Sequence, residues 1–398
     1  MGPSPEESVC GSRTEPPSEG AEDSMADPTH LLPTLDPIPL PAPVWLFKGL
    51  SYLTLTLHFS FLCILLGGLA LALVWNAWGH LRGSASARAA SNRVVTGLPM
   101  VTTYVINLGI PPLLFAQVLY GRALYTSSVL IGAWWISVVF AVMAAYAVLY
   151  RIAYLARKDS AWWGWGLVSL PIFAAVGRLF SANMSLMIRP DRWAAIYAAD
   201  SHGTTFPADP SAWARWAVVM LSALALGGLC TSLWSLGKGA SAEVRLYLRT
   251  WTPIAVLVFS PALAMAGWLA WNLQTESVRN ALEASPLAHR LATGWLLSIS
   301  LSALCGLAVF LFRRSSSWIL PVVSALPSLG VLACFVLVRD QVRDISLSEF
   351  GFDVWKSPVH TNWAVVALFL FALVAGLAVL AWIGTVLRNA KPLESDHA

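Results

Sequence analysis

Residues 50–78, LSYLTLTLHFSFLCILLGGLALALVWNAW, form the first long apolar stretch in a chain of 398 residues. An α-helix needs about 20 predominantly apolar residues to cross the hydrocarbon core of a bilayer. The stretch exceeds that length, contains no Asp, Glu, Lys or Arg, and has one histidine, His58. It therefore predicts a membrane-spanning helix with a histidine inside it.

Composition extends this prediction to the whole chain, because 57% of the residues are hydrophobic and 12% are charged. These values are typical of an integral membrane protein. The fold class is therefore all-α, a polytopic bundle of about nine membrane helices within residues 45–390. The predicted spans are Leu50–Trp78, Val95–Tyr120, Ser127–Leu155, Trp163–Ile188, Trp213–Leu236, Leu248–Leu273, Leu291–Phe312, Trp318–Val338 and Trp363–Leu387.

The orientation follows from Lys and Arg, which are held on the cytoplasmic side of a membrane. The odd-numbered connections and the C-terminus carry thirteen of them, from Arg82 to Lys391. The even-numbered connections carry nine, together with nine acidic residues. We therefore expect the N-terminus outside and the C-terminus in the cytoplasm, in a bacterial inner membrane.

The two ends of the chain differ from its centre. Residues 1–44 are rich in Pro and Ser and strongly acidic, a composition that cannot build a core, and we expect them to be disordered. Residues 391–398 form a short cytoplasmic tail. Motifs for zinc, covalent heme, phosphate binding and soluble-enzyme catalysis are absent, no catalytic residue is predicted, and nothing indicates a nucleic-acid partner.

His58 is the first candidate site residue, because an ionisable group inside a membrane helix is costly and usually functional. It lies about 12–15 Å below the outer end of its helix at ~1.5 Å per residue. Neutral imidazole is a good ligand for iron, so His58 is a candidate axial ligand of a b-type heme. The alternative is a histidine bonded to a hydroxyl or a backbone carbonyl. Gly67 and Gly68 predict close approach of a neighbouring helix.

Arg178 is the one charge well inside a predicted span, at a depth similar to that of His58. A buried guanidinium requires an anion or carbonyl groups, and heme propionates would satisfy it. Snorkelling toward the outer surface is the alternative. Met184 is a possible soft ligand or a packing residue. Every acidic residue falls outside the predicted spans, so a carboxylate pathway through the membrane is not expected.

Interior prolines fall only in the even-numbered spans: Pro99, Pro111, Pro112, Pro171, Pro253, Pro261, Pro321 and Pro327. Proline bends a helix and frees a carbonyl, so bends there would open room for a ligand, although membrane helices also tolerate proline widely. The long outer connections 189–212 and 339–362 are expected to be loops that act as a lid or docking surface, or ordinary packed loops.

The first two spans resemble subunit I of the cytochrome bd quinol oxidases. The first resembles its opening helix, with His58 after a hydroxyl-containing run and before a Leu/Gly segment. The second, NLGIPPLLFAQVLYGRALYTSSVLIG from Asn107, resembles the next helix of that subunit, with Gly109, Phe115 and the pair Tyr120-Gly121. The motifs cover residues 50–135, and nine spans with the N-terminus outside is also the topology of that subunit.

The resemblance implies a role for individual positions. His58 matches the family's high-spin heme ligand. Gln117 stands where the oxidases carry a glutamate near the oxygen-reducing hemes, and Val218 is the nearest counterpart of the histidine that ligates their low-spin heme b. The GRxPW run and the long quinol-binding loop have no match, so one or more hemes should be missing. The resemblance thus implies a divergent branch of this family.

The resulting hypothesis is a respiratory oxidoreductase subunit. It binds heme b through His58, with Arg178, Gln117 and Met184 around the cofactor, and it transfers electrons between quinol in the lipid bilayer and an outer redox partner, such as a c-type cytochrome, within a larger complex. Two alternatives stay open: a heme-free membrane anchor of a cytochrome complex, and a solute carrier in which Arg178 binds an anion.

Overall fold

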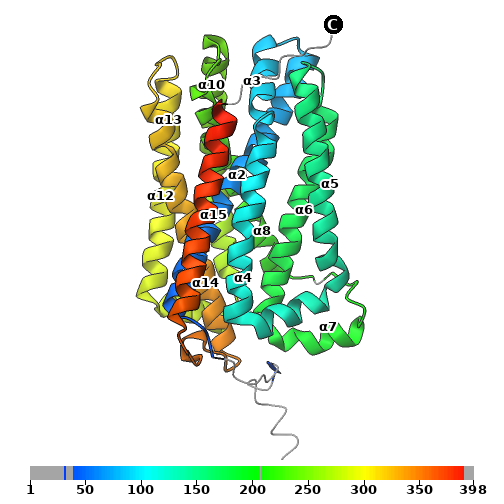
Figure 1. Ribbon diagram of the computed structural model, residues 1–398, viewed down its shortest axis with the longest axis vertical. Coiled ribbons are helices and arrows are strands. Elements are labelled where there is room, and N and C mark those ends of the chain that lie inside the picture. Colours follow the sequence, from blue (N-terminus) through cyan, green and yellow to red (C-terminus); the bar gives the residue numbers. More distant parts are fainter. Residues whose placement is uncertain (1–30, 33–38, 207, 390–398) are drawn as a thin grey trace, which may run out of the picture.

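The computed structural model describes residues 31–32, 39–206 and 208–389, with side chains up to residue 386. Within these residues, nine helices or joined helices are long and apolar enough to cross a membrane, which confirms the predicted helix bundle. They stand side by side in one bundle (Figure 1). Most of the acidic segment 1–44 and all of 391–398 lie outside the described residues.

The helices have the following bounds. The spans are α2 (Val44–Leu81), α3 with α4 (Ala85–Val95 and Leu98–Leu130), α5 (Gly132–Arg157), α6 (Trp163–Met187), α8 with η3, α9 and η4 (Pro210–Ser222, Ala223–Gly227, Gly228–Cys230 and Thr231–Leu236), α10 (Ala242–Asn272), α12 (Pro286–Leu311), α13 with α14 (Ile319–Val323 and Ala325–Ser348) and α15 (Trp363–Asn389). The connections carry η2 (Pro190–Arg192), α7 (Trp193–Ala199), α11 (Glu276–Ala284) and η5 (Val354–Lys356).

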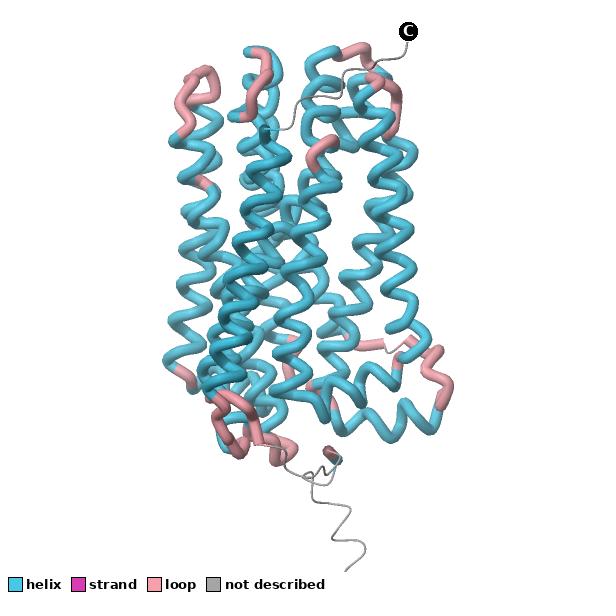
Figure 2. Tube along the Cα trace, viewed as in Figure 1, coloured by secondary structure: helices cyan, strands magenta, loops and turns pink. Residues whose placement is uncertain are grey.

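The side of the bundle on which α2 begins is called the amino side, and it lies at the bottom of Figure 1. Helix α7 lies across this end of the bundle (Figure 2). A single backbone bridge pairs Leu40 with Val359, and it ties the chain before α2 to the segment before α15. Leu40 and Ala42 are buried in this region.

Helix α2 crosses the fifth span so closely that the two backbones are in van der Waals contact. A Cβ atom on Gly67 would lie 2.0 Å from the carbonyl oxygen of Ala223, and one on Gly227 would lie 1.8 Å from that of Cys63. Only glycine permits such an approach. The predicted close packing at Gly67 is therefore confirmed. At the crossing the fifth span forms a π-helical turn, Ala223–Gly227.

Helix breaks and prolines coincide in the eighth span but not in α4, and that bends at the prolines open room for a ligand stays a prediction. In α4 the backbone leaves the helical region at Tyr120 (φ −132°, ψ 27°), beyond Pro111 and Pro112. The eighth span joins α13 to α14 at Ser324, between Pro321 and Pro327. The π-helical turn in the fifth span contains no proline and lies at the close crossing with α2.

The predicted end of the eighth span was wrong. Hydropathy ends it at Val338, but α14 continues to Ser348. Asp340 and Arg343 therefore lie within the helix and are buried. The predicted loop 339–362 consequently begins only at Glu349, and the predicted loop 189–212 contains η2 and α7. The continuation is possible because Asp340, Arg343 and Asp344 in its last turns form ion pairs inside the protein, as described below.

Candidate functional site

His58 lies on α2 with its ring against α4. Its Nδ1 atom is 2.9 Å from the carbonyl oxygen of Val105. A Cβ atom on Gly109 would lie 2.9 Å from both Nδ1 and Cε1 of His58, so a residue without a side chain makes room for the ring. The carbonyl accepts a hydrogen bond only if Nδ1 carries the proton, which leaves Nε2 with its lone pair.

The Nε2 atom of His58 has no hydrogen-bond partner among the described residues. The polar atoms of the described residues that are both enclosed and without a partner include Nε2 of His80 but not Nε2 of His58. Nε2 therefore reaches accessible space at the surface of α2. A histidine with Nδ1–H bound to a backbone carbonyl and Nε2 available is the usual arrangement of a metal-ligating imidazole.

Arg178 is 7% exposed and does not snorkel to the surface. Its guanidinium carbon lies 4.3 Å from the ring centroid of Trp213 and 4.8 Å from that of Phe206, in cation–π contacts. Its Nε and Nη1 atoms are enclosed and have no hydrogen-bond partner in the described part of the chain. The structure thus leaves donors of Arg178 free for an acceptor that these residues do not supply.

The predicted site residues His58 and Arg178 are not in direct contact with each other in the structure. No hydrogen bond, ion pair or aromatic contact within the described ranges links His58 to Arg178. Met184 is partly buried and packs against the apolar cluster on the amino side that includes Tyr120 and Leu186. Gln117 is half-buried on α4. Val218 is buried in the main core, as a packing residue of the fifth span.

Sequence analysis missed a group of ionisable side chains between α2, α4 and α14. This group, the amino-side charge cluster, comprises Lys48, Tyr52, Tyr120, Asp340, Arg343 and Asp344. The Nζ atom of Lys48 lies 2.7 Å from an Asp340 oxygen and 2.5 Å from an Asp344 oxygen. Arg343 pairs with Asp340 and stacks 3.8 Å from the Tyr120 ring centroid.

The two tyrosines complete the charge cluster. Tyr52 donates its hydroxyl hydrogen to Asp340 at 2.5 Å, and Tyr120 donates to Asp344 at 2.6 Å. Two cations and two carboxylates thus pair with one another within the bundle, and Nε of Arg343 is left without a hydrogen-bond partner among the described residues. The expectation that no carboxylate lies inside a span was therefore wrong. The signal in the sequence was the spacing of four between Asp340 and Asp344, which puts both on one helix face.

Two acidic side chains in the connections on the amino side are also tightly bound. Hydrogen bonds from the Thr204 hydroxyl and the backbone N–H groups of His202 and Thr205 hold the pKa of Asp200 well below its usual range. The pKa of Asp191 is lowered chiefly by its hydrogen bonds with Arg189. Among the described residues no group of three or more His, Cys, Asp or Glu side chains forms a metal site.

Comparison with known proteins identifies the fold. No protein-family model matches the chain, and no curated protein matches it. A solved structure, that of bd oxidase from Geobacillus thermodenitrificans, is similar with a TM-score of 0.67. The match covers 88% of this chain and 99% of that chain at 13% sequence identity. The resemblance seen in the first two spans is thus confirmed at the level of the fold, and it extends over most of the chain.

Proposed function

We propose that this protein is a membrane subunit of a respiratory electron-transfer complex of the bd oxidase type, which binds one b-type heme through Nε2 of His58. The observation that carries the proposal is the geometry of His58, because its Nδ1 is bound to Val105 and its Nε2 is accessible. The similarity in fold to a bd oxidase supports the assignment to this class.

The residues around His58 fit an iron ligand. The Val105 carbonyl fixes the tautomer and the ring orientation, and it raises the basicity of Nε2. Gly109 keeps the ring close to α4, so the imidazole is positioned before any ligand arrives. A bound heme would supply one-electron chemistry. Arg178 has unsatisfied donors that suit a carboxylate, so it remains our candidate partner of a heme propionate.

The proposed direction of electron flow is from quinol in the bilayer to a redox protein on the amino side, such as a c-type cytochrome. It rests on the distribution of basic residues, which indicates that the amino side faces outward from a bacterial cytoplasmic membrane. Gln117 and Val218 replace family residues that serve oxygen reduction and the low-spin heme. We therefore propose that the subunit does not itself reduce oxygen.

The test is a reduced-minus-oxidised absorption spectrum of the purified protein, with heme quantified as its pyridine hemochrome. We expect one b-type heme per chain and its loss in His58→Ala. His289→Ala is the matched control, because His289 is an exposed histidine whose Nδ1 also lies near a backbone carbonyl, that of Ser285. A wild-type protein without a heme band, or a band that persists in His58→Ala, would exclude heme ligation by His58.

A second candidate function is a heme-free anchor for a cytochrome. Helix α15 favours it, because Val366 is the only buried residue of Trp363–Val386 and an apolar helix face thus remains free for a neighbouring subunit. A colourless purified chain that copurifies with a cytochrome would support the anchor and contradict the heme proposal.

A further inference from the structure

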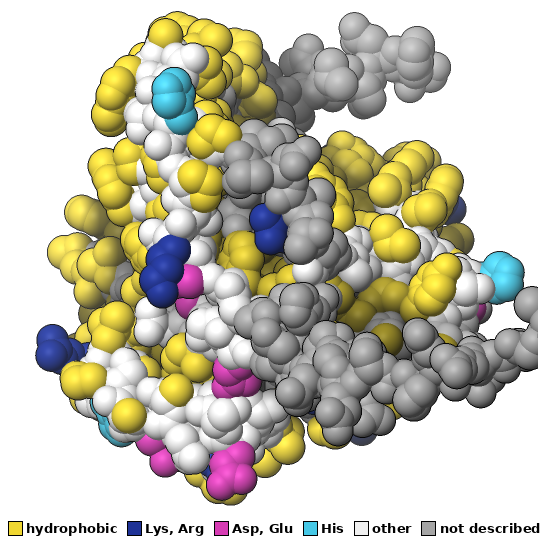
Figure 3. Space-filling model, turned by 90° about the horizontal axis from the view of Figure 1, so that it is seen from below, with side chains coloured by type: hydrophobic (Ala, Val, Ile, Leu, Met, Phe, Trp, Pro, Cys, Tyr) yellow, Lys and Arg dark blue, Asp and Glu magenta, His cyan; other side chains and the backbone are white. Residues whose placement is uncertain are grey.

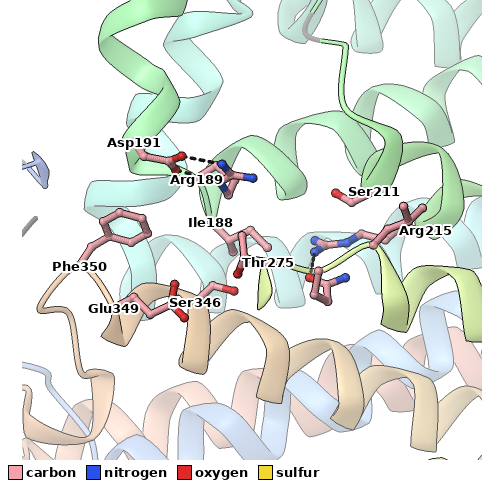
Figure 4. Close-up of a pocket in the computed structure, with 11 residues that line it drawn as sticks. Ile188, Arg189, Asp191, Ser211, Arg215, Thr275, Ser346, Glu349 and Phe350 are labelled. Atoms are coloured by element: carbon pink, nitrogen blue, oxygen red, sulfur yellow. Dashed lines mark hydrogen bonds and ion pairs between the residues drawn. The ribbon is translucent and has the colours of Figure 1, made fainter. Parts of the chain in front are cut away.

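A polar cavity lies at the amino-side ends of α6, α8, α10 and α14. Its volume is about 200 Å³, well above the roughly 30 Å³ that one water molecule occupies in the liquid. Arg215 and Ser211 of α8 face Thr275, Ser346 and Glu349 across it, and the Arg189–Asp191 pair lies at another edge (Figure 4). On the part of the amino-side face that is formed by described residues, by contrast, charged side chains are scattered (Figure 3).

Arg215 supplies the free donors of this cavity. A guanidinium has five N–H donors, and the hydrogen bond recorded for Arg215 is from Nη2 to Oε1 of Gln274 at 3.0 Å. None of the Arg215 nitrogen atoms is both enclosed by the described residues and without a hydrogen-bond partner. The remaining donors therefore reach accessible space, and the cavity that Arg215 lines is that space.

A second guanidinium, that of Arg339, lies on α14, farther from the amino side than the cavity. Residues at i, i+4 and i+7 share a helix face, so Arg339 lies on the same face as Arg343 and Ser346, about 10 Å deeper in the bundle than Ser346 at 1.5 Å per residue. Arg339 is close enough to Arg215 and Arg343 for their positive charges to repel. No hydrogen bond or ion pair ends on Arg339 within the described part of the chain.

Four of the five neighbouring carboxylates are engaged by other partners, and Glu349 is the exception. Asp191 accepts from Nε and Nη2 of Arg189 at 2.9 and 2.6 Å. Asp209 caps α8 by accepting from the backbone N–H and the hydroxyl of Ser211 at 2.9 and 3.0 Å. Asp340 and Asp344 belong to the charge cluster. Glu349 is exposed at the rim. Neither Arg215 nor Arg339 thus forms an ion pair with a carboxylate of the described residues, although Asp209 lies near Arg215 and Glu349 lines the cavity.

We propose that this cavity binds a phosphate group, held by Arg215 and attracted by the charge of Arg339. A buried or half-buried cation requires an anion, and the guanidinium fork matches phosphate oxygens. Helices α8, α10 and α14 all begin or end here, at the level where lipid headgroups lie. The phosphate therefore comes either from a phospholipid headgroup or from free phosphate. This inference is independent of heme binding.

The experiment uses the full-length protein, purified and delipidated in an uncharged detergent. In one arm, inorganic phosphate is titrated while the thermal unfolding midpoint is followed, with sodium chloride at equal ionic strength as the reference. In the other arm, native mass spectrometry measures retention of phosphatidylglycerol against monogalactosyl diacylglycerol, a lipid without phosphate. A response to inorganic phosphate identifies free phosphate as a ligand, and selective retention of phosphatidylglycerol identifies a headgroup.

The variants are Arg215→Gln and the matched control Arg290→Gln, which removes the same charge from an exposed site on α12. We expect about tenfold or greater weakening in Arg215→Gln, the loss expected for a charge-assisted hydrogen bond, and no change in Arg290→Gln. Without phosphate, Arg215→Gln should unfold no earlier than wild type, because repulsion with Arg339 is relieved. Absence of any phosphate-specific response in wild type, or equal binding by Arg215→Gln, would overturn the proposal.

Discussion

Replacement of Lys48 by methionine tests whether paired charges hold the start of α2 against the end of α14. Methionine keeps an unbranched chain of similar volume and removes only the ammonium group. Lys48 is 1% exposed and contacts Asp340 and Asp344 at 2.7 and 2.5 Å. In the variant, Arg343 is the one cation left in the cluster beside the buried Asp340 and the half-buried Asp344. Removing one member of a buried ion pair costs about 3–5 kcal/mol.

We therefore expect the free energy of unfolding to fall by about 3–5 kcal/mol in Lys48→Met. It is measured by titration of the protein from mild detergent micelles into sodium dodecyl sulfate, with loss of helix followed by circular dichroism. Lys356→Met is the control, since the Lys356 side chain is 85% exposed and lies 3.5 Å from Asp353. A pair this exposed contributes at most about 1 kcal/mol.

The double variant Lys48→Met/Asp344→Asn separates charge pairing from packing. It removes one cation and one carboxylate, so Arg343 and Asp340 remain as a matched pair. We expect the double variant to recover part of the stability lost in Lys48→Met, which is a coupling that additive effects would not produce. If Lys48→Met unfolds like Lys356→Met, or if the second substitution only adds to the loss, the charge cluster does not stabilise the bundle.

Three further predictions concern the helix crossing, the histidine and the amino-side loop. Gly227→Ala should destabilise the bundle by about 3 kcal/mol in the same titration, because its Cβ atom would lie 1.8 Å from the Cys63 carbonyl oxygen. Gly376→Ala is the control and should be neutral, because no atom lies within 4 Å of the added Cβ. Gly109→Ala should displace the His58 ring and lower heme content per chain, while Gly132→Ala, which is also unobstructed, should leave it unchanged. The lowered pKa of Asp200 means that its hydrogen bonds order residues 200–205 fully above pH ~4 and lose strength as pH falls toward the lowered value. Amide exchange of His202 and Thr205, corrected for intrinsic rates, should therefore accelerate at low pH and in Asp200→Asn at pH 7; unchanged exchange in the variant would contradict this.

Much of the architecture follows from one physical rule, that an apolar stretch of about 20 residues crosses a bilayer as a helix. The rule located nine spans but misplaced some ends. It stopped the eighth span at Val338 and began the first at Leu50, whereas α14 ends at Ser348 and α2 starts at Val44. Hydropathy scores each charged side chain as if it faced lipid alone. Lys48 and Asp340 instead neutralise each other although 292 positions separate them.

For the candidate site, individual residues could be selected from the sequence, but their contacts could not. His58 could be selected because an imidazole inside an apolar run is costly without a partner. Its partner could not be named, because the Val105 carbonyl is a backbone atom that no sequence pattern distinguishes. Arg178 was also selected, but its neighbours Phe206 and Trp213 come from a connection and from the fifth span. Arg215 was missed because it lies near a span end, where arginine is common.

The balance of charge connects these sites. Inside the amino-side half of the bundle, the described carboxylates Asp340 and Asp344 are committed to Lys48 and Arg343. Arg178 retains enclosed donors without an acceptor, and the repulsion between Arg215 and Arg339 is not relieved by any ion pair among the described residues. A guanidinium does not lose its proton in a protein, so neutralisation by deprotonation is not available. The free donors of these arginines, together with the commitment of Asp340 and Asp344 elsewhere, are the common ground for proposing a bound anion at each of the two places.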